Sequence, residues 1–486
     1  MRSRRKFRYQ SDQGNLNTSG NIMALLRTRK LWLLLLGVGL LRLLTSSMYP
    51  LLDPTEARYG EIARIMAETG NWIVPQIDYG TPFWGKPPLS FWASALSISL
   101  FENSEFFLRL PHIFAAAGVL FLVWYFVRAL DGSRRQADIA AAVIATTIGF
   151  LVAAGSVMTD MFLCLAMTLT MTGFWRGWHG EKAQVYLMYT GLGIGLLAKG
   201  PVIIILVGVA LFPWLVIHYG IKGLWRPLWQ RLHLPSGILL MLAITIPWYW
   251  LAERESPGFL EYFILGEHFQ RFIDSGWKGD LYGSGHAQIR GTIWIYWLVV
   301  AIPWSPLLLI AAGRTVLREH SLLPRDQLTS FALLWMCSPM LLFTLAGNIL
   351  PAYVVPGLPA IGLLMMNASA LKPLANSRYL LLVGPAMLLI ISSYAALIAA
   401  DEYSDKDLLA RGIDSGDALY YLDSRPYSAQ YYSNGQATLA KTVPLSGRFY
   451  LVIKNKRKPA ELDSRCELRS ENDRRRLFFC QLDAPA

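Results

Sequence analysis

Long apolar runs separated by short polar segments constrain this chain more than any other feature of its sequence. Runs of about 17–22 residues recur between residues 31 and 400. As helices they are long enough to cross a hydrocarbon core of about 30 Å. Charged residues make up only 16% of the 486 residues, compared with roughly 25% in soluble domains. The sequence therefore predicts an all-α polytopic membrane protein.

The positions of the basic residues predict how the chain is threaded through the bilayer. The eleven candidate spans are residues 31–48, 110–129, 138–155, 160–176, 184–199, 201–218, 235–252, 292–312, 329–346, 350–368 and 379–400. Residues 1–30 are basic and are followed by no small-residue cleavage site, which favours a retained first span with a cytoplasmic N-terminus. Every second connection is then cytoplasmic, and all five such connections carry Lys or Arg, as the positive-inside rule requires.

This parity holds only if the apolar segment 87–101 does not cross the membrane. It has about 15 residues interrupted by polar side chains, which is short for a span. We expect an interfacial helix on the outer side. The net charge of +12 does not indicate nucleic acid binding, because the basic residues occupy these short connections.

Three segments are predicted to lie outside the cytoplasm: residues 49–109, residues 253–291 and the tail 401–486. The tail stretches "DALYYLDSRPYSAQYYSN" and "GRFYLVIKNK" are typical of short strands with intervening turns, which predicts a small α/β domain on the outer surface. Cys466 and Cys480 are either free or joined by a disulfide. Cys164 and Cys337 lie in apolar runs and are expected to be small buried hydrophobic residues.

The segment "YPLLDPTEARYGEIARIMAETGNWIVP" places four acidic residues directly after the first span. Asp53, Pro54 and Glu56 suit the N-cap, first and third positions of a helix, as in a capping box. The helix that follows places Glu56 and Tyr59 on one face and is amphipathic enough to lie on a membrane surface. These acids therefore either start a helix or take part in chemistry, and the motif alone leaves both open.

Other ionisable residues are predicted at the same membrane face, where burying an ion is costly and is mostly functional. Each has a plainer alternative, namely snorkelling to headgroups for a lysine, helix capping for an aspartate and an ordinary loop position for a histidine. These residues are Lys86, Asp160, Lys199, Glu267, His268 and Arg271. Cations beside carboxylates at one leaflet fit a reaction on a lipid phosphate, with the cations holding the phosphate and a carboxylate handling a proton.

Several motifs resemble those of the polyprenyl-phosphate-sugar glycosyltransferases of the GT-C superfamily. They are "DPTEARYGEIARIM", "FWGKPPLSFW", "TDMFL", "LAKGPV", "PGFLEYFILGEHFQRF" and "LPAYVVPGLPA". The nearest branch is similar to the bacterial aminoarabinose lipid A transferases, which are related to protein O-mannosyltransferases. The resemblance implies about eleven spans with interfacial helices and an active site that faces the periplasm from the bacterial inner membrane.

The resemblance also implies roles for particular residues. Asp53 is implied as the leading catalytic carboxylate, with Asp160 and Glu56 beside it. Lys86, Arg271, Tyr353 and Lys199 are implied to bind the phosphate of the carrier, and Tyr59, His268 and Glu267 to contact the substrate. The implied partners are an undecaprenyl-phosphate-sugar donor, lipid A or another glycolipid acceptor, and the lipid bilayer, and we expect a monomer.

Two departures from the family pattern affect what is carried over. Gly85 stands where many relatives have an acidic residue, which weakens a divalent metal site built with His268, and we predict no metal ligands. "LAGNILPAY" lacks the serine- and lysine-rich stretch that often precedes "LPxY". The alternatives that remain are a protein O-mannosyltransferase-like enzyme and a transporter or flippase. A transporter would place ionisable residues near the middle of the bilayer.

Overall fold

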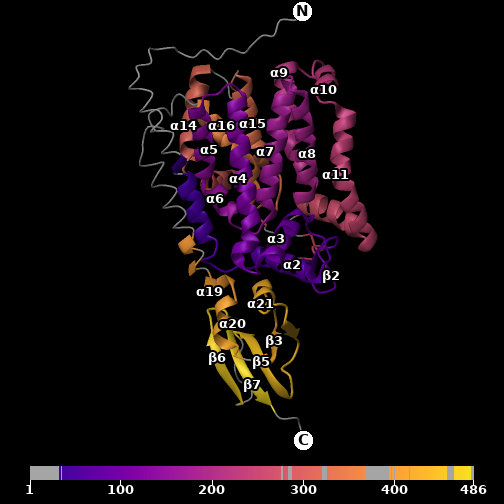
Figure 1. Ribbon diagram of the computed structural model, residues 1–486, viewed down its shortest axis with the longest axis vertical. Helices are drawn as coiled ribbons and strands as arrows, with labels where there is room; N and C mark the ends of the chain where they lie inside the picture. The colour runs from indigo at the N-terminus through magenta and orange to yellow at the C-terminus, as the bar shows by residue number, and fades with distance from the viewer. Residues whose placement is uncertain are drawn as a thin grey trace, which may run out of the picture.

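The computed structural model is mostly helical, with a small β-sheet region at the C-terminal end (Figure 1). It describes residues 32–482 apart from 34, 275–276, 283–286, 320–323, 325, 368–392, 396, 399, 415 and 457–464. The helical elements are Leu35–Thr45, α2 Thr55–Thr69, α3 Leu89–Leu100, α4 Glu105–Ala129, α5 Arg134–Ala145, α6 Ile148–Ala154, α7 Thr159–Trp178, α8 Lys182–Lys199, α9 Val202–Tyr219, α10 Trp225–Arg231, α11 Leu234–Glu255, η1 Glu261–Gln270, α12 Arg271–Ile273, α13 Thr292–Val300, α14 Ser305–Glu319, α15 Gln327–Phe343, η2 Pro351–Gly357, α16 Pro359–Asn367, α19 Ala400–Tyr403, α20 Lys406–Gly412 and α21 Tyr427–Tyr432. The strands are β1 Gln76–Asp78, β2 Thr81–Pro82, β3 Ala418–Leu422, β4 Ala437–Ala440, β5 Gly447–Lys454, β6 Cys466–Glu471 and β7 Arg475–Leu482.

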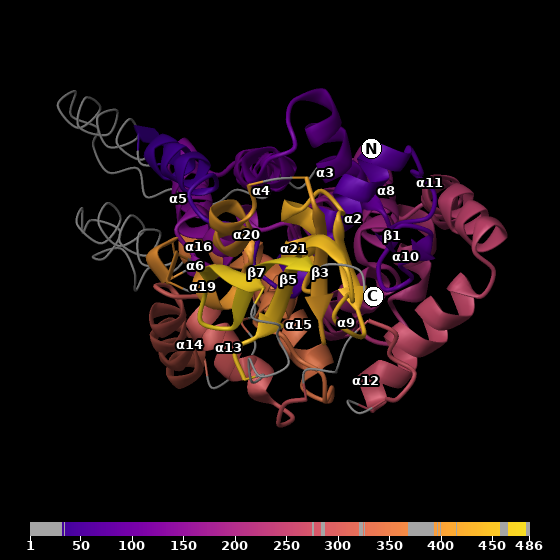
Figure 2. The same ribbon diagram turned by 90° about the horizontal axis from the view of Figure 1, so that it is seen from below.

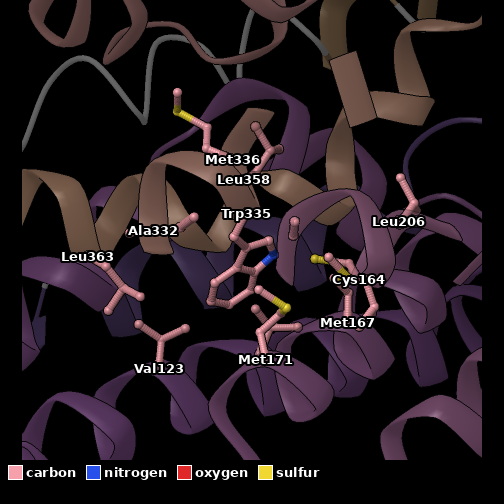
Figure 3. Close-up of a cluster of buried hydrophobic side chains, with 14 of the residues drawn as sticks. Val123, Cys164, Met167, Met171, Leu206, Ala332, Trp335, Met336, Leu358 and Leu363 are labelled. Carbon is pink, nitrogen blue, oxygen red and sulfur yellow. The ribbon is translucent and has the colours of Figure 1, made fainter. Parts of the chain in front are cut away.

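The helical bundle is built around α7, which is buried along almost its whole length. Trp335 of α15 lies fully buried against side chains of α7, among them Met167 and Met171 (Figure 3). The hydroxyls of Thr168, Thr170 and Thr172 in α7 each donate to the carbonyl four residues earlier. These threonines can therefore be buried among other helices without leaving a donor unpaired.

The count of eleven spans is not confirmed by the length and composition of the described helices. Three are long and apolar enough to cross a membrane, namely α4, α9 and α11. Two bent pairs raise the number to five if each is one span, α5 with α6 at 71° and α13 with the first part of α14 at 110°. The two bends meet, since the backbone N–H of Ile148 donates to the carbonyl of Ile302 at 3.0 Å.

Other predicted spans differ from a continuous helix or lie outside the described residues. The segment predicted over 350–368 is a 3₁₀ turn, η2, followed by α16. Most of the segment predicted over 379–400 falls outside the described residues. The segment predicted to be interfacial, 87–101, contains α3 of 12 residues, which at 1.5 Å per residue is only about 18 Å long.

The C-terminal region forms a five-stranded sheet in the order β4-β3-β5-β7-β6. Strands β4, β3 and β5 are parallel, whereas β7 is antiparallel to both β5 and β6. The sheet lies beyond the end of the bundle that holds α2 and α3, and the view from below shows its strands in front of the bundle (Figures 1 and 2). The small α/β region expected from the tail sequence is therefore present.

The β6–β7 hairpin is closed by the disulfide Cys466–Cys480, so one of the two alternatives for these cysteines is realised. Cys164 is buried and free, as expected, while Cys337 is free and only half-buried. The expectation of short strands with turns in "DALYYLDSRPYSAQYYSN" is confirmed in its first half, which contains β3, and is wrong in its second half, where Tyr427–Tyr432 form α21. This helix packs against α2, and that tertiary contact outweighs the β-preference of its tyrosines.

Of the two alternatives for the motif after the first span, the capping box is not seen, because α2 begins at Thr55 and has no side-chain cap. The carboxylate of Glu56 is instead bound by Arg109 of α4, with Nε–Oε1 at 2.9 Å and Nη2–Oε2 at 3.0 Å. Ten of the 15 residues of α2 are buried, and the helix packs against α3 and α21. Its position at a membrane surface stays a prediction.

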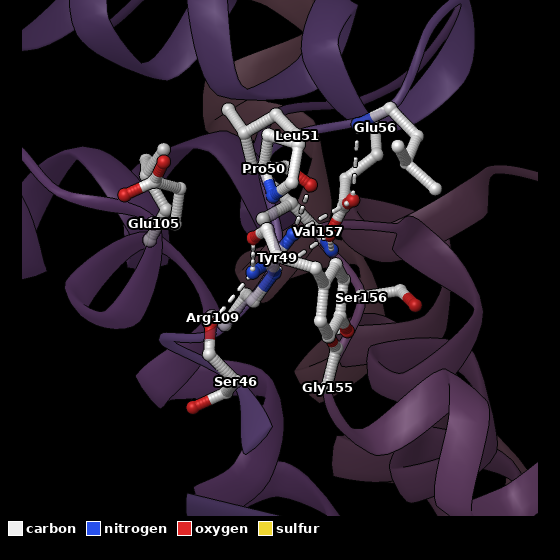
Figure 4. Close-up of polar contacts among 12 residues, drawn as sticks. Ser46, Tyr49, Pro50, Leu51, Glu56, Glu105, Arg109, Gly155, Ser156 and Val157 are labelled. Atoms are coloured by element: carbon white, nitrogen blue, oxygen red, sulfur yellow. Dashed lines mark hydrogen bonds and ion pairs between the residues drawn. The ribbon is translucent and has the colours of Figure 1, made fainter. Parts of the chain in front are cut away.

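Arg109 forms hydrogen bonds to several chain segments at this end of the bundle (Figure 4). Its guanidinium is fully buried and also donates to three carbonyl groups after the first helix, those of Ser46, Tyr49 and Pro50, at 2.6–3.0 Å. Its charge lies over the ring of Tyr49 at 3.9 Å from the centroid. Glu56 in turn accepts the backbone N–H of Val157 at 3.2 Å, just before α7. One ion pair thus joins four segments of the chain.

Replacing Arg109 by methionine should lower the free energy of unfolding by about 3–5 kcal/mol, because the carboxylate of Glu56 would stay buried without its partner. The matched control is Arg411→Met. Arg411 forms an exposed ion pair with Asp407, and such pairs contribute less than about 1 kcal/mol. Unfolding of both variants by denaturant titration in detergent micelles measures the difference. Equal losses in the two variants would contradict this role for Arg109.

Candidate functional site

Two cations from separate segments converge on one carboxylate near the end of η1. Lys86, which precedes α3, lies with its Nζ at 2.5 Å from Oε1 of Glu267. Arg271 approaches the same carboxylate at 2.7 Å and also lies 3.5 Å from Asp280. The Glu267 side chain is only 5% exposed. Glu267, which was predicted to contact the substrate, is therefore paired with Lys86 and Arg271.

The carboxyl group of Glu267 stays ionised despite its burial. Burial alone would raise the pKa of its carboxyl, but the charges and hydrogen bonds of Lys86 and Arg271 lower that pKa to about 2. Nε of Arg271 is buried and has no hydrogen-bond partner among the residues that the structure describes. A buried donor without a partner is costly in a finished structure. The site therefore retains a hydrogen-bond donor for an anionic ligand.

A second ion pair joins the two helix ends that face this one. Asp160 opens α7 and Lys199 closes α8, and Nζ of Lys199 lies 2.5 Å from Oδ1 of Asp160. The expected capping role of Asp160 is not seen, because the cap residue of α7 is Met158 and no side chain bonds there. The ammonium of Lys199 also lies 4.5 Å from the ring centroid of Tyr353 in η2.

His268 connects the two ion pairs, because it directly follows Glu267 in the chain and its ring contacts the main chain of Lys199. Burial raises the pKa of the Tyr59 phenol. The imidazole of His268 faces the carbonyl oxygen of Phe263 at 2.7 Å through Nδ1 and that of Lys199 at 3.2 Å through Nε2. Six of these residues form what we call the charged cluster: Lys86, Asp160, Lys199, Glu267, Arg271 and Tyr353.

The residues present do not suit a divalent metal. Both ring nitrogens of His268 face carbonyl oxygens, and Gly85 offers no ligand beside it. No group of three or more His, Cys, Asp or Glu side chains able to hold a metal ion was found within the described part of the chain. The mechanism below therefore uses no metal.

Asp53 lies at the same end of the molecule but has different partners. Its carboxylate accepts the backbone N–H of Ser428 at 3.1 Å through Oδ1 and the Ser428 hydroxyl through Oδ2. Ser428 belongs to α21 of the C-terminal region. Across the residues that the structure describes, no hydrogen bond or ion pair joins Asp53 to the charged cluster. Burial raises the pKa of Asp53 to about 6, although the bonds from Ser428 act to lower it.

Arg58 lies beside both Tyr59 and Tyr427, and none of the sequence motifs singled it out. Its guanidinium lies 5.5 Å from the ring centroid of Tyr59 and 5.7 Å from that of Tyr427, which precedes Ser428. It donates to the carbonyl of Tyr282 at 2.8 Å, and its buried Nε has no partner. The only signal was its place one residue before Tyr59.

Glu56 and the other acids of the opening motif have contacts that stabilise the fold. Glu56 binds Arg109, as described above, and its predicted catalytic role stays a prediction. The buried Glu61 accepts two bonds from Arg64 at 2.7 Å, and Glu68 binds Arg64 and Tyr79. These three carboxylates each have an arginine partner, whereas Asp53 has none in hydrogen-bonding contact.

The chain is similar in sequence and in fold to known membrane glycosyltransferases. Residues 27–263 match the family described as dolichyl-phosphate-mannose-protein mannosyltransferase (PMT). The chain also has the fold of a solved structure, that of ArnT from Cupriavidus metallidurans bound to undecaprenyl phosphate. The TM-score is 0.76 and the identity 19%, with 97% of this chain and 100% of that one covered. The apo state of the same protein gives a TM-score of 0.71.

Two sequence relatives share the name undecaprenyl phosphate-alpha-4-amino-4-deoxy-L-arabinose arabinosyl transferase. The relative from Edwardsiella ictaluri is 28% identical over 319 residues, which are 64% of this chain and 54% of that protein. The one from Erwinia tasmaniensis is 28% identical over 350 residues, 70% of this chain and 59% of that protein. The chain thus matches less than two thirds of their length. The resemblance to polyprenyl-phosphate-sugar glycosyltransferases that the motifs predicted is confirmed.

Glu267→Gln should remove a contribution to stability that depends on pH. Because the pKa of Glu267 is lowered from 4.5 to about 2, the carboxylate stabilises the fold fully above about pH 5, and this contribution is lost as the pH falls toward 2. The melting temperatures of wild type and variant should therefore differ most near pH 6 and converge in acid. The exposed Glu102 provides the control Glu102→Gln. A difference that is constant from pH 6 to pH 3 would contradict the prediction.

Proposed function

We propose that this protein is an inverting glycosyltransferase that moves a sugar from an undecaprenyl-phosphate carrier to lipid A or another lipopolysaccharide acceptor. The observation that carries the proposal is the convergence of Lys86 and Arg271 on one buried carboxylate, next to the Asp160–Lys199 pair. Cations held close together in a poorly solvated site suit a phosphate better than a neutral ligand. The names of the relatives support the same donor chemistry.

The phosphate of the carrier gains negative charge when its bond to the sugar breaks. Lys86 and Arg271 would stabilise that charge, and removing one such donor typically costs about 3 kcal/mol of barrier. In the absence of ligand, Glu267 satisfies both cations. A bound phosphate would share them, with the unpartnered Nε of Arg271 as a further donor.

Asp53 would accept the proton from the attacking hydroxyl or phosphate oxygen of the acceptor. Its pKa of about 6 leaves it ionised at neutral pH yet more basic than an ordinary aspartate, as suits a general base. Asp160 and Lys199 would orient the reacting groups, and Tyr59 would line the space between them and Arg58. A single displacement inverts the sugar carbon and needs no covalent intermediate on the enzyme.

The finer topology is part of the same proposal. Eleven spans place residues 49–109, 253–291 and 401–486 on the periplasmic face of the bacterial inner membrane, with residues 1–30 in the cytoplasm. The common location of α2, α3 and the C-terminal sheet at one end of the bundle supports this arrangement (Figure 1). We expect the active unit to be a monomer.

Mass spectrometry of lipid A and core oligosaccharide from cells with and without the gene tests the function. A sugar-sized mass present on lipopolysaccharide only with the gene supports the proposal. Label from the carrier found in protein instead would select an O-mannosyltransferase-like enzyme. Movement of labelled carrier across vesicles without any acceptor would select a flippase.

Asp53→Asn should abolish transfer while leaving the amount and melting temperature of the protein nearly unchanged, because the amide cannot take up the proton. In wild type, the rate should fall as the pH drops below about 6, where Asp53 becomes protonated. Initial rates with purified protein and carrier-linked sugar from pH 5 to 8 measure both effects. Asp473→Asn, at an exposed position, is the control, and near-normal turnover in Asp53→Asn would refute the assignment of the base.

Lys86→Ala should weaken binding of the carrier, with an increase in KM of about 10- to 100-fold, as expected when a charge-assisted contact of about 1.5–3 kcal/mol is lost. Lys278→Ala, which removes an exposed lysine of the same outer region, should leave KM unchanged. Titration of each variant with undecaprenyl phosphate gives the affinities. An affinity in Lys86→Ala equal to that of wild type would exclude Lys86 from the phosphate site.

A further inference from the structure

The C-terminal sheet region touches the helical bundle through several buried or half-buried polar contacts. The Tyr432 hydroxyl accepts the backbone N–H of Leu51 at 2.7 Å and donates to Glu105 at 2.9 Å. The Tyr431 hydroxyl donates to Asn103 at 2.9 Å. Ion pairs join Lys406 to Glu105 and Arg425 to Asp78. These contacts hold the C-terminal sheet region against the helical bundle, and one of them, to Leu51, lies two residues before Asp53.

One residue of that region contacts both oxygens of the proposed base. The backbone N–H of Ser428 binds Oδ1 of Asp53, and its hydroxyl binds Oδ2. The main chain of Asp53 is also held, since its N–H donates to the carbonyl of Tyr403 at 2.7 Å. Ser428 is fully buried, whereas Asp53 is partly exposed. The carboxylate is thus held at both of its oxygens by Ser428.

Ser428 is in turn held by a buried polar network. Its hydroxyl oxygen accepts the backbone N–H of Asp405 at 3.1 Å. The Asp405 carboxylate accepts from Tyr421 of β3 and from Arg475 of β7, each at 3.0 Å. Asp405, Tyr421 and Arg475 are all buried. Because the Ser428 oxygen already accepts one bond, its own hydrogen is directed at Asp53.

From these contacts we infer that Ser428 is a positioning residue for the transfer reaction, through which the C-terminal region orients the carboxylate of Asp53. The inference rests on the proposed function, because it takes Asp53 as the base. A carboxylate free to rotate presents its basic lone pair to the acceptor only part of the time. One held at both oxygens presents it continuously, and misplacing a catalytic group by about 1 Å can cost a factor of 10² in rate.

The contact also affects the protonation of Asp53, which gives a measurement that a purely structural role would not change. Burial raises the pKa of Asp53, and the two bonds from Ser428 partly offset this effect. The other groups that act on Asp53 are Asp405, which raises its pKa, and Arg475, which lowers it. Tyr421 is a further titratable neighbour, through its hydrogen bond to Asp405. Loss of the Ser428 hydroxyl alone should raise the pKa of Asp53 above about 6.

The test compares Ser428→Ala and Ser428→Thr in the full chain, with Ser433→Ala as the matched control. Ser433 follows α21 and bonds only within the C-terminal region. We expect Ser428→Ala to lower kcat by about 10- to 100-fold, to leave KM for the carrier unchanged and to shift the acid limb of the rate profile to higher pH. Ser428→Thr should restore both properties, and Ser433→Ala should resemble wild type. A Ser428→Ala profile that coincides with that of wild type overturns the inference.

A direct titration separates this inference from the proposed function. Infrared spectra of the protein in micelles, with the Asp53 band identified by its loss in Asp53→Asn, give the protonation midpoint of Asp53 without any turnover. A midpoint that rises in Ser428→Ala supports the control of Asp53 by Ser428 even if wild type transfers no sugar, in which case only the proposed function fails. An unchanged midpoint overturns the inference. If Ser428→Ala does not fold, Ser428→Cys, with a weaker donor at the same position, replaces it.

Discussion

The buried ion pair between Arg109 and Glu56 is the interaction on which the candidate site depends. The guanidinium of Arg109 donates five hydrogen bonds, two to Glu56 and three to the carbonyls of Ser46, Tyr49 and Pro50 after the first helix. Since Glu56 also binds the N–H of Val157, the start of α2 and the start of α7 are held side by side. Asp53 and Asp160 lie three residues from these two contacts. Asp53 and Asp160 therefore lie at the same end of the bundle, because the buried guanidinium of Arg109 holds the two helix starts together and water does not compete for its hydrogen bonds.

The charged cluster is stable for a related reason. A lone charge in this poorly solvated region would be costly, so each cation lies against a carboxylate. The pairing is incomplete, however, because within the described part of the chain the buried Nε of Arg271 has no partner, and neither has that of the nearby Arg58. A site that is nearly neutral without ligand and still offers donors can accept a phosphate without large rearrangement, since only the sharing of existing cations has to change.

Much of this arrangement was predictable from spacing and residue type. The apolar runs indicated the helices, the tail indicated a small sheet, and cations were expected beside acids at one end. The sequence could not show that Glu56 binds Arg109, because the local pattern of Asp53, Pro54 and Glu56 matches a helix cap equally well. Nor could it show that Asp53 meets Ser428, which is 375 residues away. Bends between α5 and α6 and between α13 and α14 also depend on packing, because each half is stabilised by its neighbours.

The sequence by itself determined that this chain forms apolar helices with its ionisable residues near their ends. The reason is that unpaired backbone groups and charged side chains are costly in the hydrocarbon core of a membrane. It also determined the motifs shared with glycosyltransferases. Only the tertiary structure decided which acid is bound by which cation, and that the C-terminal sheet reaches Asp53. The reason is physical: burial and hydrogen bonding set the charge and orientation of a carboxylate, and both are produced by segments that are distant in the chain.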